Sequence, residues 1–278
     1  IARVVRGDLE RKVGVSFKDV WITLFSKIVN MQSNRRAYEV GEQHYDVGND
    51  LYTRMLDKRM VYTCGYWRNA DNLDDAQEAK LDLVCRKIGL EPGMTVLDLG
   101  CGWGSFAQYA AENYGAEVTG LTVSQDQVEL GKKMCRDLPV DIRLEDYRKV
   151  EGSYDRVISI GLIEHVGYKN YDQYMKVVDS TLKDDGVAFI HCIGSNVSTT
   201  SGNAWTNKYI FPNGMLPSIA QLSKAMEGTF ILEDLHNIGE HYDPTLMAWY
   251  ENFENAWPEL REKYGDRFYR MWRFYLLS

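Results

Sequence analysis

The chain has 278 residues, of which 45% are hydrophobic and 26% charged, so it can bury one large core or two small ones and is not a disordered chain. The net charge of −8 at pH 7 disfavours generic nucleic-acid binding, and every apolar run is shorter than the ~20 residues that span a bilayer. Five cysteines, sparse and odd in number, favour a reducing cytoplasm over a disulfide framework. No histidines or cysteines stand at zinc-ligand spacing; His236 and His241 are the nearest candidates and are better explained as two polar positions around a turn, so we predict no metal site.

The N-terminal region, residues 1–36, is predicted to be helical. Its stretch VSFKDVWITLFSKIVNM spaces large apolar residues at intervals of three and four. The chain begins with Ile-Ala-Arg rather than Met and has no secretory signal pattern. We therefore expect its first residue to lie inside a longer protein.

Residues 94–194 alternate short β-rich runs with helical segments. The runs are MTVLDLG, AEVTGLT, VDIRLE, YDRVISIG and VAFIHCIG. Strands that alternate with helices predict an α/β fold with a parallel sheet covered on both faces.

The region after residue 194 begins with a long segment of no clear period. Residues 196–216 are polar and then aromatic, which is typical of a lid or binding loop. FILEDLHNIG is predicted to be a strand, and DPTLMAWYENFENAW a helix with Asp243 as N-cap and Pro244 in the first turn.

A glycine-rich turn follows the first β-rich run, in VLDLGCGWGS. Its glycines are Gly100, Gly102 and Gly104, and Asp98 precedes them. Dinucleotide sites use the different spacing G-x-G-x-x-G and an acid about 20 residues later, but here Thr122 ends the second run and Ser124 lies just beyond it. The turn alone therefore predicts only a nucleotide-like ligand between a strand and a helix.

Further motifs resemble one family of methyltransferases. LDLGCGWG resembles the first motif of S-adenosylmethionine-dependent methyltransferases, and VTGLTVSQDQ the second-strand turn of the cyclopropane fatty acid synthases and their mycolic-acid relatives. The resemblance continues through HYDVGNDLYTRMLDKRMVYTCGYW, IGLIEHVGYKNY, FIHCIGS, WTNKYIFPNGMLPS and HNIGEHYDPTLMAWYENF. It implies a Rossmann-like fold with a seven-stranded, mostly parallel sheet, helices on both faces, a helical N-terminal segment and a lid insertion.

The family resemblance also implies the residues that bind S-adenosylmethionine. Bare backbone at the glycine turn would approach its methionine part, because a side chain there would block the approach. Ser124 and Gln127 could instead form only a helix capping box, and Tyr147 could be plain packing. The implied cofactor residues are Tyr62, Thr63, Gly100, Gly102, Gly104, Thr122, Ser124, Gln127, Tyr147 and Arg148.

The implied acceptor is a cis double bond in a phospholipid acyl chain, a poor nucleophile. Methyl attack leaves a cation equivalent, so the site should be apolar, exclude water, and still hold one base for the departing proton. In the family a bicarbonate ion is thought to take this proton. By resemblance it is surrounded by Glu164, His191, Tyr242, Cys64 and Ile193.

These polar residues also have structural interpretations. Cys64 could be a small buried hydrophobe, His191 a core histidine and Glu164 a helix N-terminal acid. Taken singly, the structural interpretation is preferable for Cys64 and His191. Found together inside matching family motifs, all three are predicted to be catalytic.

The implied lipid substrate requires a surface that contacts a membrane. Residues 19–36 and 261–278 mix aromatic and basic side chains, as interfacial surfaces do, but each could equally pack on the protein's own core. We expect a cytoplasmic protein bound peripherally to the membrane, and a homodimer formed through such surfaces is a further possibility.

The resemblance to this family implies two domains and leaves three alternative functions to consider. Residues 1–36 are interpreted as the remnant of an N-terminal lipid-binding domain, and 37–278 as the catalytic domain with a lid at about 196–228. The predicted function is cyclopropane formation on phospholipid. The rivals are methyl branching of lipid or N-methylation of a small amine, and a membrane-binding module without catalysis, which the intact Glu164, His191 and Tyr242 set opposes.

Overall fold

The protein is described by a computed structural model for residues 48–278. The predicted N-terminal helix and the candidate membrane segment 19–36 lie outside these residues. The division of the chain at residue 36, and the role of 196–228 as a lid, stay predictions.

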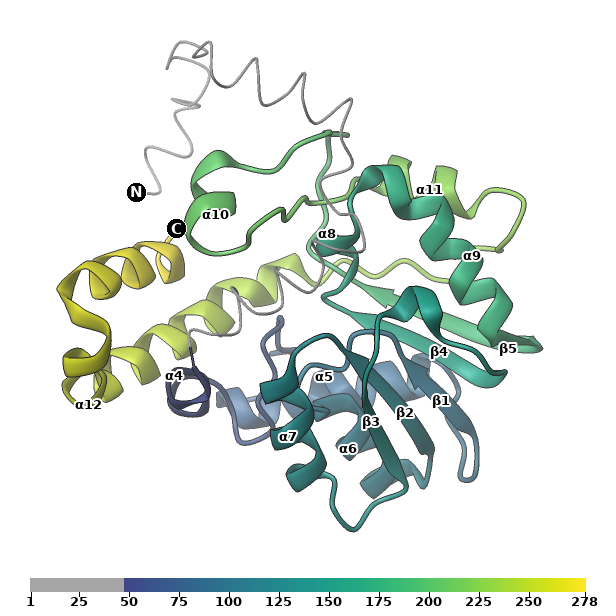
Figure 1. Cartoon of the computed structure of the whole chain (residues 1–278), viewed down its shortest axis with the longest axis horizontal. Helices are drawn as coiled ribbons and strands as arrows, with labels where there is room; N and C mark the ends of the chain where they lie inside the picture. The colour runs from purple at the N-terminus through teal and green to yellow at the C-terminus, as the bar shows by residue number, and fades with distance from the viewer. Residues whose placement is uncertain (1–47) are drawn as a thin grey trace.

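One sheet of parallel strands lies at the centre of the described chain, in the order β3-β2-β1-β4-β5 (Figure 1). All four neighbouring pairs are parallel, which confirms the α/β prediction. The described residues supply five strands rather than the expected seven. The strands are β1 Thr95–Asp98, β2 Glu117–Thr122, β3 Val140–Leu144, β4 Tyr154–Ile160 and β5 Leu182–His191.

The helices cover both faces of this sheet because neighbouring strand residues point to opposite sides. Val96 packs in a cluster with Phe106 and Val84, whereas the next residue, Leu97, packs with Tyr174 on the other face. The helices are α4 Asn49–Met55, α5 Leu73–Lys87, α6 Ser105–Tyr114, α7 Gln125–Met134, α8 Ile163–Val166, α9 Tyr171–Thr181, α10 Ala204–Tyr209, α11 Ile219–Met226 and α12 Tyr242–Leu276; the 3-10 turns are η2 Tyr147–Lys149, η3 Tyr168–Asn170 and η4 Gly239–His241.

An aromatic cluster joins α4 and α12 beside the sheet. Trp249 and Phe253 of α12 are completely buried, and so is Tyr52 of α4. The backbone of Gly265 is not helical (φ 74°), so α12 consists of two helices that meet at a bend, visible at the left of Figure 1. The bend brings Trp272 back against Tyr52, with ring centroids 6.3 Å apart.

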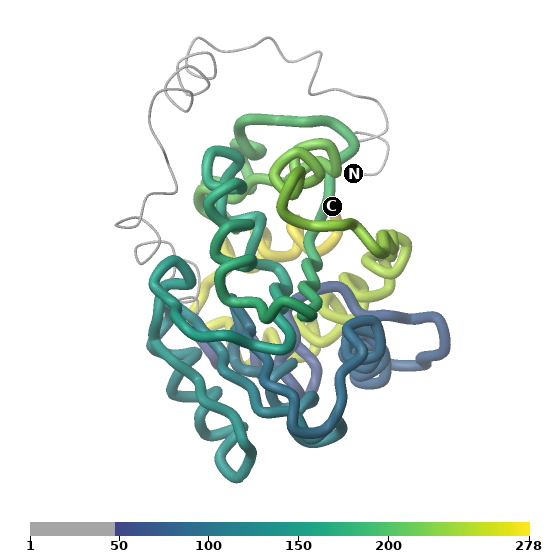
Figure 2. The backbone as a smooth tube through the Cα atoms, turned by 90° about the vertical axis from the view of Figure 1, so that its right-hand side faces the viewer, coloured from purple at the N-terminus to yellow at the C-terminus, as the bar shows by residue number. Residues whose placement is uncertain are grey.

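The predicted lid lies over the carboxyl ends of the strands. Figure 2 shows this green segment above the blue and teal part of the chain. Residues 204–209, expected to be irregular, form the short helix α10, because Asn203 accepts hydrogen bonds from the amides of Trp205 and Thr206. The amide of Met215 donates to the carbonyl of Glu164 at 2.8 Å, so the lid is attached to the end of β4 through α8.

Two local predictions were wrong. The segment FILEDLHNIG is not a strand: Ile231, Leu232 and Leu235 are exposed, and no described strand lies beside it to supply a ladder of hydrogen bonds. Asp243 does not cap its helix, because η4 runs directly into α12 and places His241 at the cap and Asp243 in the first turn.

Candidate functional site

A cavity lies at the carboxyl ends of β1, β2 and β4, where open α/β sheets bind ligands. The segment before the sheet and the lid complete its wall through Tyr62, Thr63, Pro212 and Asn213. Eight of the ten predicted cofactor residues line it, namely Tyr62, Thr63, Gly100, Gly102, Thr122, Gln127, Tyr147 and Arg148. Gly104 and Ser124 do not.

The three glycines of the turn differ in what surrounds them. A β-carbon added at Gly102 would meet nothing within 4 Å, so this glycine opens toward the cavity that it lines. One added at Gly104 would lie 3.2 Å from Ile142 and 3.3 Å from Cys135, in the protein interior. Both residues have positive φ, which glycine adopts without strain. Gly102 leaves room for a ligand, whereas Gly104 allows α6 to pack against β3.

Beyond β2, a buried pair of side chains forms the next part of the wall. The hydroxyl of Thr122 donates to Oε1 of Gln127 at 2.6 Å, and Nε2 of Gln127 is buried without a partner. Ser124 caps α7 by accepting from the Gln127 amide at 3.4 Å. Its own amide donates to Thr122, so the Gln127 side chain does not complete a capping box. The orphaned amide of Gln127 therefore remains available for a ligand.

The turn after β3 forms the opposite rim. Arg148 donates from Nε to Asp146 at 2.8 Å, and both side chains are almost completely buried. Tyr147 lies edge-on to Tyr174, with ring centroids 5.6 Å apart, and also lines the cavity. Tyr147 therefore both packs on α9 and lines the cavity.

A second polar cluster adjoins the cavity on its β4 side, although its residues do not line it. The amide of Ile193 donates to Oε1 of Glu164 at 2.8 Å, and Oε2 of Glu164 is buried without a partner. Nδ1 of His191 is likewise buried without a partner, and its carbonyl accepts from Gly161, which lines the cavity. The structure thus brings Glu164, His191 and Ile193 together.

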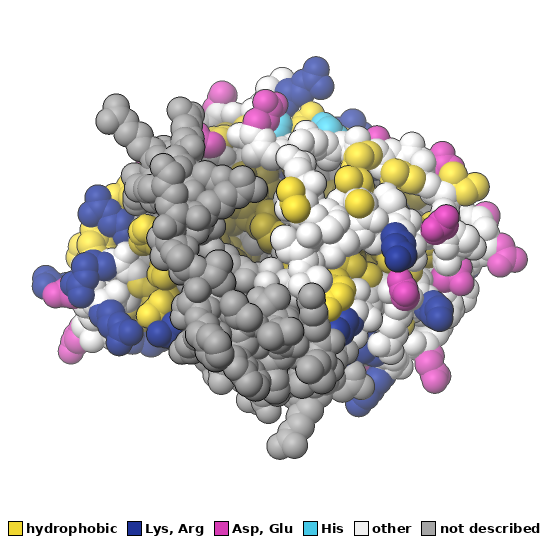
Figure 3. Space-filling view, turned by 90° about the horizontal axis from the view of Figure 1, so that it is seen from above, with side chains coloured by type: hydrophobic (Ala, Val, Ile, Leu, Met, Phe, Trp, Pro, Cys, Tyr) yellow, Lys and Arg dark blue, Asp and Glu magenta, His cyan; other side chains and the backbone are white. Residues whose placement is uncertain are grey.

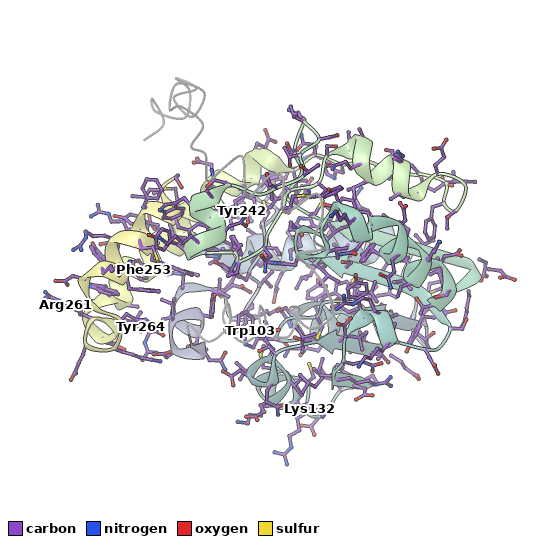
Figure 4. The ribbon with its side chains drawn as sticks, turned by 45° about the horizontal axis from the view of Figure 1, so that its top comes forward. Trp103, Lys132, Tyr242, Phe253, Arg261 and Tyr264 are labelled. Carbon is purple, nitrogen blue, oxygen red and sulfur yellow. The ribbon has the colours of Figure 1, made fainter. Side chains whose placement is uncertain are left out.

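Cys64 and Tyr242 approach this cluster from outside the sheet. Burial is the main cause of the high pKa of Tyr242, and electrostatic interactions with Cys64 and Glu164 add to it, so the three side chains are within electrostatic reach. Tyr242, at the start of α12, packs against the same aromatic cluster that contains Trp103 of the glycine turn; both are labelled in Figure 4. The five predicted residues therefore lie in one region between the sheet, the lid and α12.

Burial keeps most of these groups neutral. It raises the pKa of the Cys64 thiol to about 11 and the pKa of Tyr242 well above its usual value, and it lowers the pKa of His191 to about 3. Burial also raises the pKa of Glu164 to about 7, close to neutrality. Glu164 can therefore act as either a hydrogen-bond donor or an acceptor at physiological pH.

Lys80, Asp98, Asp146 and His165 also line the cavity, although the sequence analysis did not assign them to it. Lys80 had a signal: it stands on the buried face of α5 with Ala76, Leu81 and Val84. A lysine at helical spacing within an apolar stripe is unusual. No such pattern pointed to His165, because in the motif IGLIEHVGYKNY the predicted role was assigned to its neighbour Glu164.

Among residues 48–278, no group of three or more His, Cys, Asp or Glu side chains could hold a metal ion. The candidate ligand His241 is engaged elsewhere, since its Nδ1 accepts a hydrogen bond from the amide of Trp67 at 3.3 Å.

Within the same residues, no helix combines the length and the apolar character needed to cross a bilayer.

The strand order, the glycine turn after β1 and the cavity at the strand ends define the fold of the S-adenosylmethionine-dependent methyltransferases. The family described as mycolic acid cyclopropane synthetase matches residues 32–278, and the chain belongs to this family.

Relatives and solved structures agree with this assignment. The chain is 49% identical over 275 residues to the cyclopropane-fatty-acyl-phospholipid synthase of Escherichia coli (strain K12), covering 99% of this chain and 72% of that one. It is 36% identical over 263 residues to sphingolipid C9-methyltransferase A of Emericella nidulans, covering 88% and 51%. The cyclopropane synthase MmaA2 from Mycobacterium tuberculosis superposes with a TM-score of 0.80 at 29% identity, covering 86% of this chain and 90% of that one.

Gly102→Val should lower the affinity for S-adenosylhomocysteine by roughly 10- to 100-fold, as expected for overpacking that costs ~1–3 kcal/mol. Gly93→Val is the matched control, since Gly93 also has positive φ and open space but lies on an exposed turn outside the cavity. Isothermal titration calorimetry should detect the loss for Gly102→Val alone. Equal affinities in the two variants would contradict a ligand at the glycine turn.

Glu164→Gln should change how the stability of the protein depends on pH. The pKa of Glu164 rises from its usual 4.5 to about 7 on folding, so the folded state holds the proton more tightly and wild-type stability falls between these values. The free energy of unfolding of the variant minus that of the wild type should therefore be roughly 2–3 kcal/mol larger above pH 7 than at pH 4.5, at ~1.4 kcal/mol per pKa unit. Urea unfolding at several pH values measures this difference, which should be constant if Glu164 does not titrate with a raised pKa.

Proposed function

We propose that this site transfers a methylene group from S-adenosylmethionine to the cis double bond of an unsaturated acyl chain in a membrane phospholipid, forming a cyclopropane fatty acid. The observation that carries the proposal is the unpartnered carboxyl oxygen of Glu164, buried beside the cavity of the glycine turn. The 49% identity with a cyclopropane-fatty-acyl-phospholipid synthase supports it.

The residues of the cavity fit S-adenosylmethionine. Gly102 leaves open space, and the buried Nε2 of Gln127 offers an unused donor. Tyr62, Thr63 and Gly100 would hold the methionine part together with these residues, and Tyr147 and Arg148 would border the adenine. Gly104 and Ser124 would act indirectly, through packing and through the cap of α7. When bound, the co-substrate supplies an electrophilic methyl group on a sulfonium.

The wall toward α12 suits a cationic reaction in an apolar space. The ring of Tyr62 lies 5.2 Å from that of Trp249 and 6.3 Å from that of Phe211 (centroid distances). Phe211 lies on the lid, 5.8 Å from the ring of Tyr275. Aromatic faces stabilise positive charge, and their bulk excludes the water that would otherwise trap a cation.

The second cluster fits a bicarbonate ion, which would supply the acceptor for the proton that leaves the new methyl group. Glu164 Oε2 and His191 Nδ1 are buried and unpartnered, and Tyr242 and Cys64 add a hydroxyl and a thiol. With its pKa near 7, Glu164 can donate a proton to a bound anion. The Ile193 amide is already bonded to Glu164, so its role is to orient that carboxyl group.

A methyl-branched lipid product is the second candidate. The 36% identity to a sphingolipid C9-methyltransferase favours it, although this chain spans about half of that relative. N-methylation has less support, because the chain is only 22% identical to coclaurine N-methyltransferase and that likeness concerns the fold.

The membrane contact of this proposal lies at the end of α12. Phe274 and Leu277 are exposed there, next to exposed Arg267, Arg270 and Arg273. The ring of Phe274 lies 4.7 Å from that of Trp205 on α10 (centroid distance), which extends the same surface. Figure 3 shows basic and hydrophobic side chains together at the left end, where Figure 1 places α12. A cytoplasmic protein bound peripherally through this surface could reach its lipid.

The acceptor is tested by the release of S-adenosylhomocysteine, measured with three acceptors. Vesicles of cis-unsaturated phospholipid should support turnover. Vesicles of a saturated phospholipid kept fluid by branched chains should not, and neither should a small secondary amine. Turnover with the amine but not with the unsaturated vesicles would overturn the proposed function.

Removing dissolved carbonate should lower the activity of the wild type, and added bicarbonate should restore it. Glu164→Gln should lose ~10²–10⁴-fold in rate, as is typical for one proton-transfer group, with little change in cofactor affinity, and should respond poorly to bicarbonate. Glu151→Gln, at an exposed position, is the control. Full activity of the wild type without carbonate would mean that a side chain, Tyr242 or His191, is the base.

The membrane surface is tested by charge reversal. The wild type should sediment with anionic vesicles more than with neutral ones, and salt should weaken the binding. The double variant Arg267→Glu/Arg270→Glu should lose roughly tenfold or more in affinity, at ~1 kcal/mol per basic residue. Arg136→Glu, on an exposed part of the chain outside this surface, should not. If the double variant binds normally but a dimer dissociates, the surface instead joins two copies of the chain.

A further inference from the structure

Lys80 of α5 is a buried cation in the wall of the cavity. Its side chain is 1% exposed, and its Nζ donates to the hydroxyl of Thr63 at 3.0 Å. Lys80 and Thr63 both line the cavity. Burial lowers the pKa of Lys80 to about 8, so the ammonium is mainly charged at neutral pH.

The protein partners of this ammonium do not satisfy it. An ammonium carries three donors, and Thr63 is its one hydrogen-bond partner among residues 48–278. In the same part of the chain no carboxylate forms an ion pair with it within 4.0 Å, although Asp57 and Asp98 partly offset the lowering of its pKa by burial. Asp57 accepts instead from the amides of Val61 and Arg59. A buried charge without close compensation is costly, so a ligand anion would stabilise it.

The residues that line the cavity beside Lys80 indicate which part of a ligand would lie there. Asp98, at the end of β1, and Gly100 line the same cavity, and the Gly100 amide donates to Asp98 at 3.3 Å. Lys80 and Asp98 thus present an ammonium and a carboxyl group to one cavity, and these groups complement the carboxylate and the ammonium of an amino acid. The methionine part of S-adenosylmethionine carries a carboxylate and an ammonium, and it is the part expected at the glycine turn.

We propose that Lys80 binds the carboxylate of the methionine part of S-adenosylmethionine, with Thr63 holding the ammonium of Lys80 in position. This inference rests on the proposed function. Gln77, one turn before Lys80, supports the same segment, because its Nε2 donates to the Thr63 carbonyl at 2.8 Å. Helix α5 thus fixes both the backbone and the hydroxyl of Thr63 beside the cavity.

The bicarbonate cluster is the other possible location for an anion near Lys80. Burial is the main cause of the low pKa of His191, and the charge on Lys80 adds to it, so the two groups are within electrostatic reach. However, Glu164, His191, Cys64 and Tyr242 do not line the cavity that Lys80 and Thr63 share. The geometry therefore favours the carboxylate of the co-substrate.

The test compares S-adenosylhomocysteine with its decarboxylated analogue by isothermal titration calorimetry. The wild type should prefer the carboxylated ligand by roughly 10- to 100-fold, as expected for a hydrogen bond between charged groups. In Lys80→Met, which keeps the length of the side chain, this preference should disappear while the affinity for the analogue stays unchanged. Lys132→Met, at an exposed position of α7 outside the cavity, is the matched control, and it should retain the preference. Lys80→Gln replaces the Met variant if that protein does not fold.

Each result has one interpretation. A wild-type preference that persists in the Lys80 variant overturns the inference, as does an equal loss of affinity for both ligands, which would show a structural role only. If the preference persists and the variant requires more bicarbonate for activity, Lys80 serves the proton-acceptor site instead. Failure of the wild type to bind either ligand would contradict the proposed function itself.

Discussion

The structure depends on the contacts that hold the segment before the sheet, which contains Tyr62 and Thr63, against the end of strand β4. Gln77 and Lys80 of α5 hold Thr63 from one side, and a β-carbon added at Gly161 would lie 3.0 Å from the Thr63 methyl group on the other. This contact places Tyr62 beside Trp249 and closes the cavity toward α12. A reaction through a cationic state requires such a dry space, so the polar contacts of α5 are the condition for the apolar site.

The same constraint explains the properties of the polar groups near the cavity. Burial keeps His191, Cys64 and Tyr242 neutral, and it brings the pKa of Glu164 to about 7. A protein that must handle one proton without admitting bulk water needs groups of this kind. The unpartnered atoms of Glu164 and His191 are then explained by a small ligand that is exchanged at each turnover.

The sequence was sufficient for the fold class and for eight of the residues that line the cavity, because glycine spacing, strand–helix alternation and short motifs are local signals. It was insufficient where the signal depends on what packs against a residue. Gly104 shares a motif with Gly102, yet it contacts Ile142 rather than the cavity. The segment FILEDLHNIG has the composition of a strand, but a strand forms only beside a partner, and the described chain provides none. Lys80 was missed because charged residues on a helix are usually solvated.

The most direct test of the account is the fate of the transferred methyl hydrogens. With S-adenosylmethionine that carries a fully deuterated methyl group and vesicles of cis-unsaturated phospholipid, mass spectrometry of the fatty acid counts the deuterium atoms. A site that holds a proton acceptor beside a dry cavity should give a cyclopropane product with two deuterium atoms. A product that retains all three would show that no proton leaves the methyl group, and it would contradict ring formation at this site.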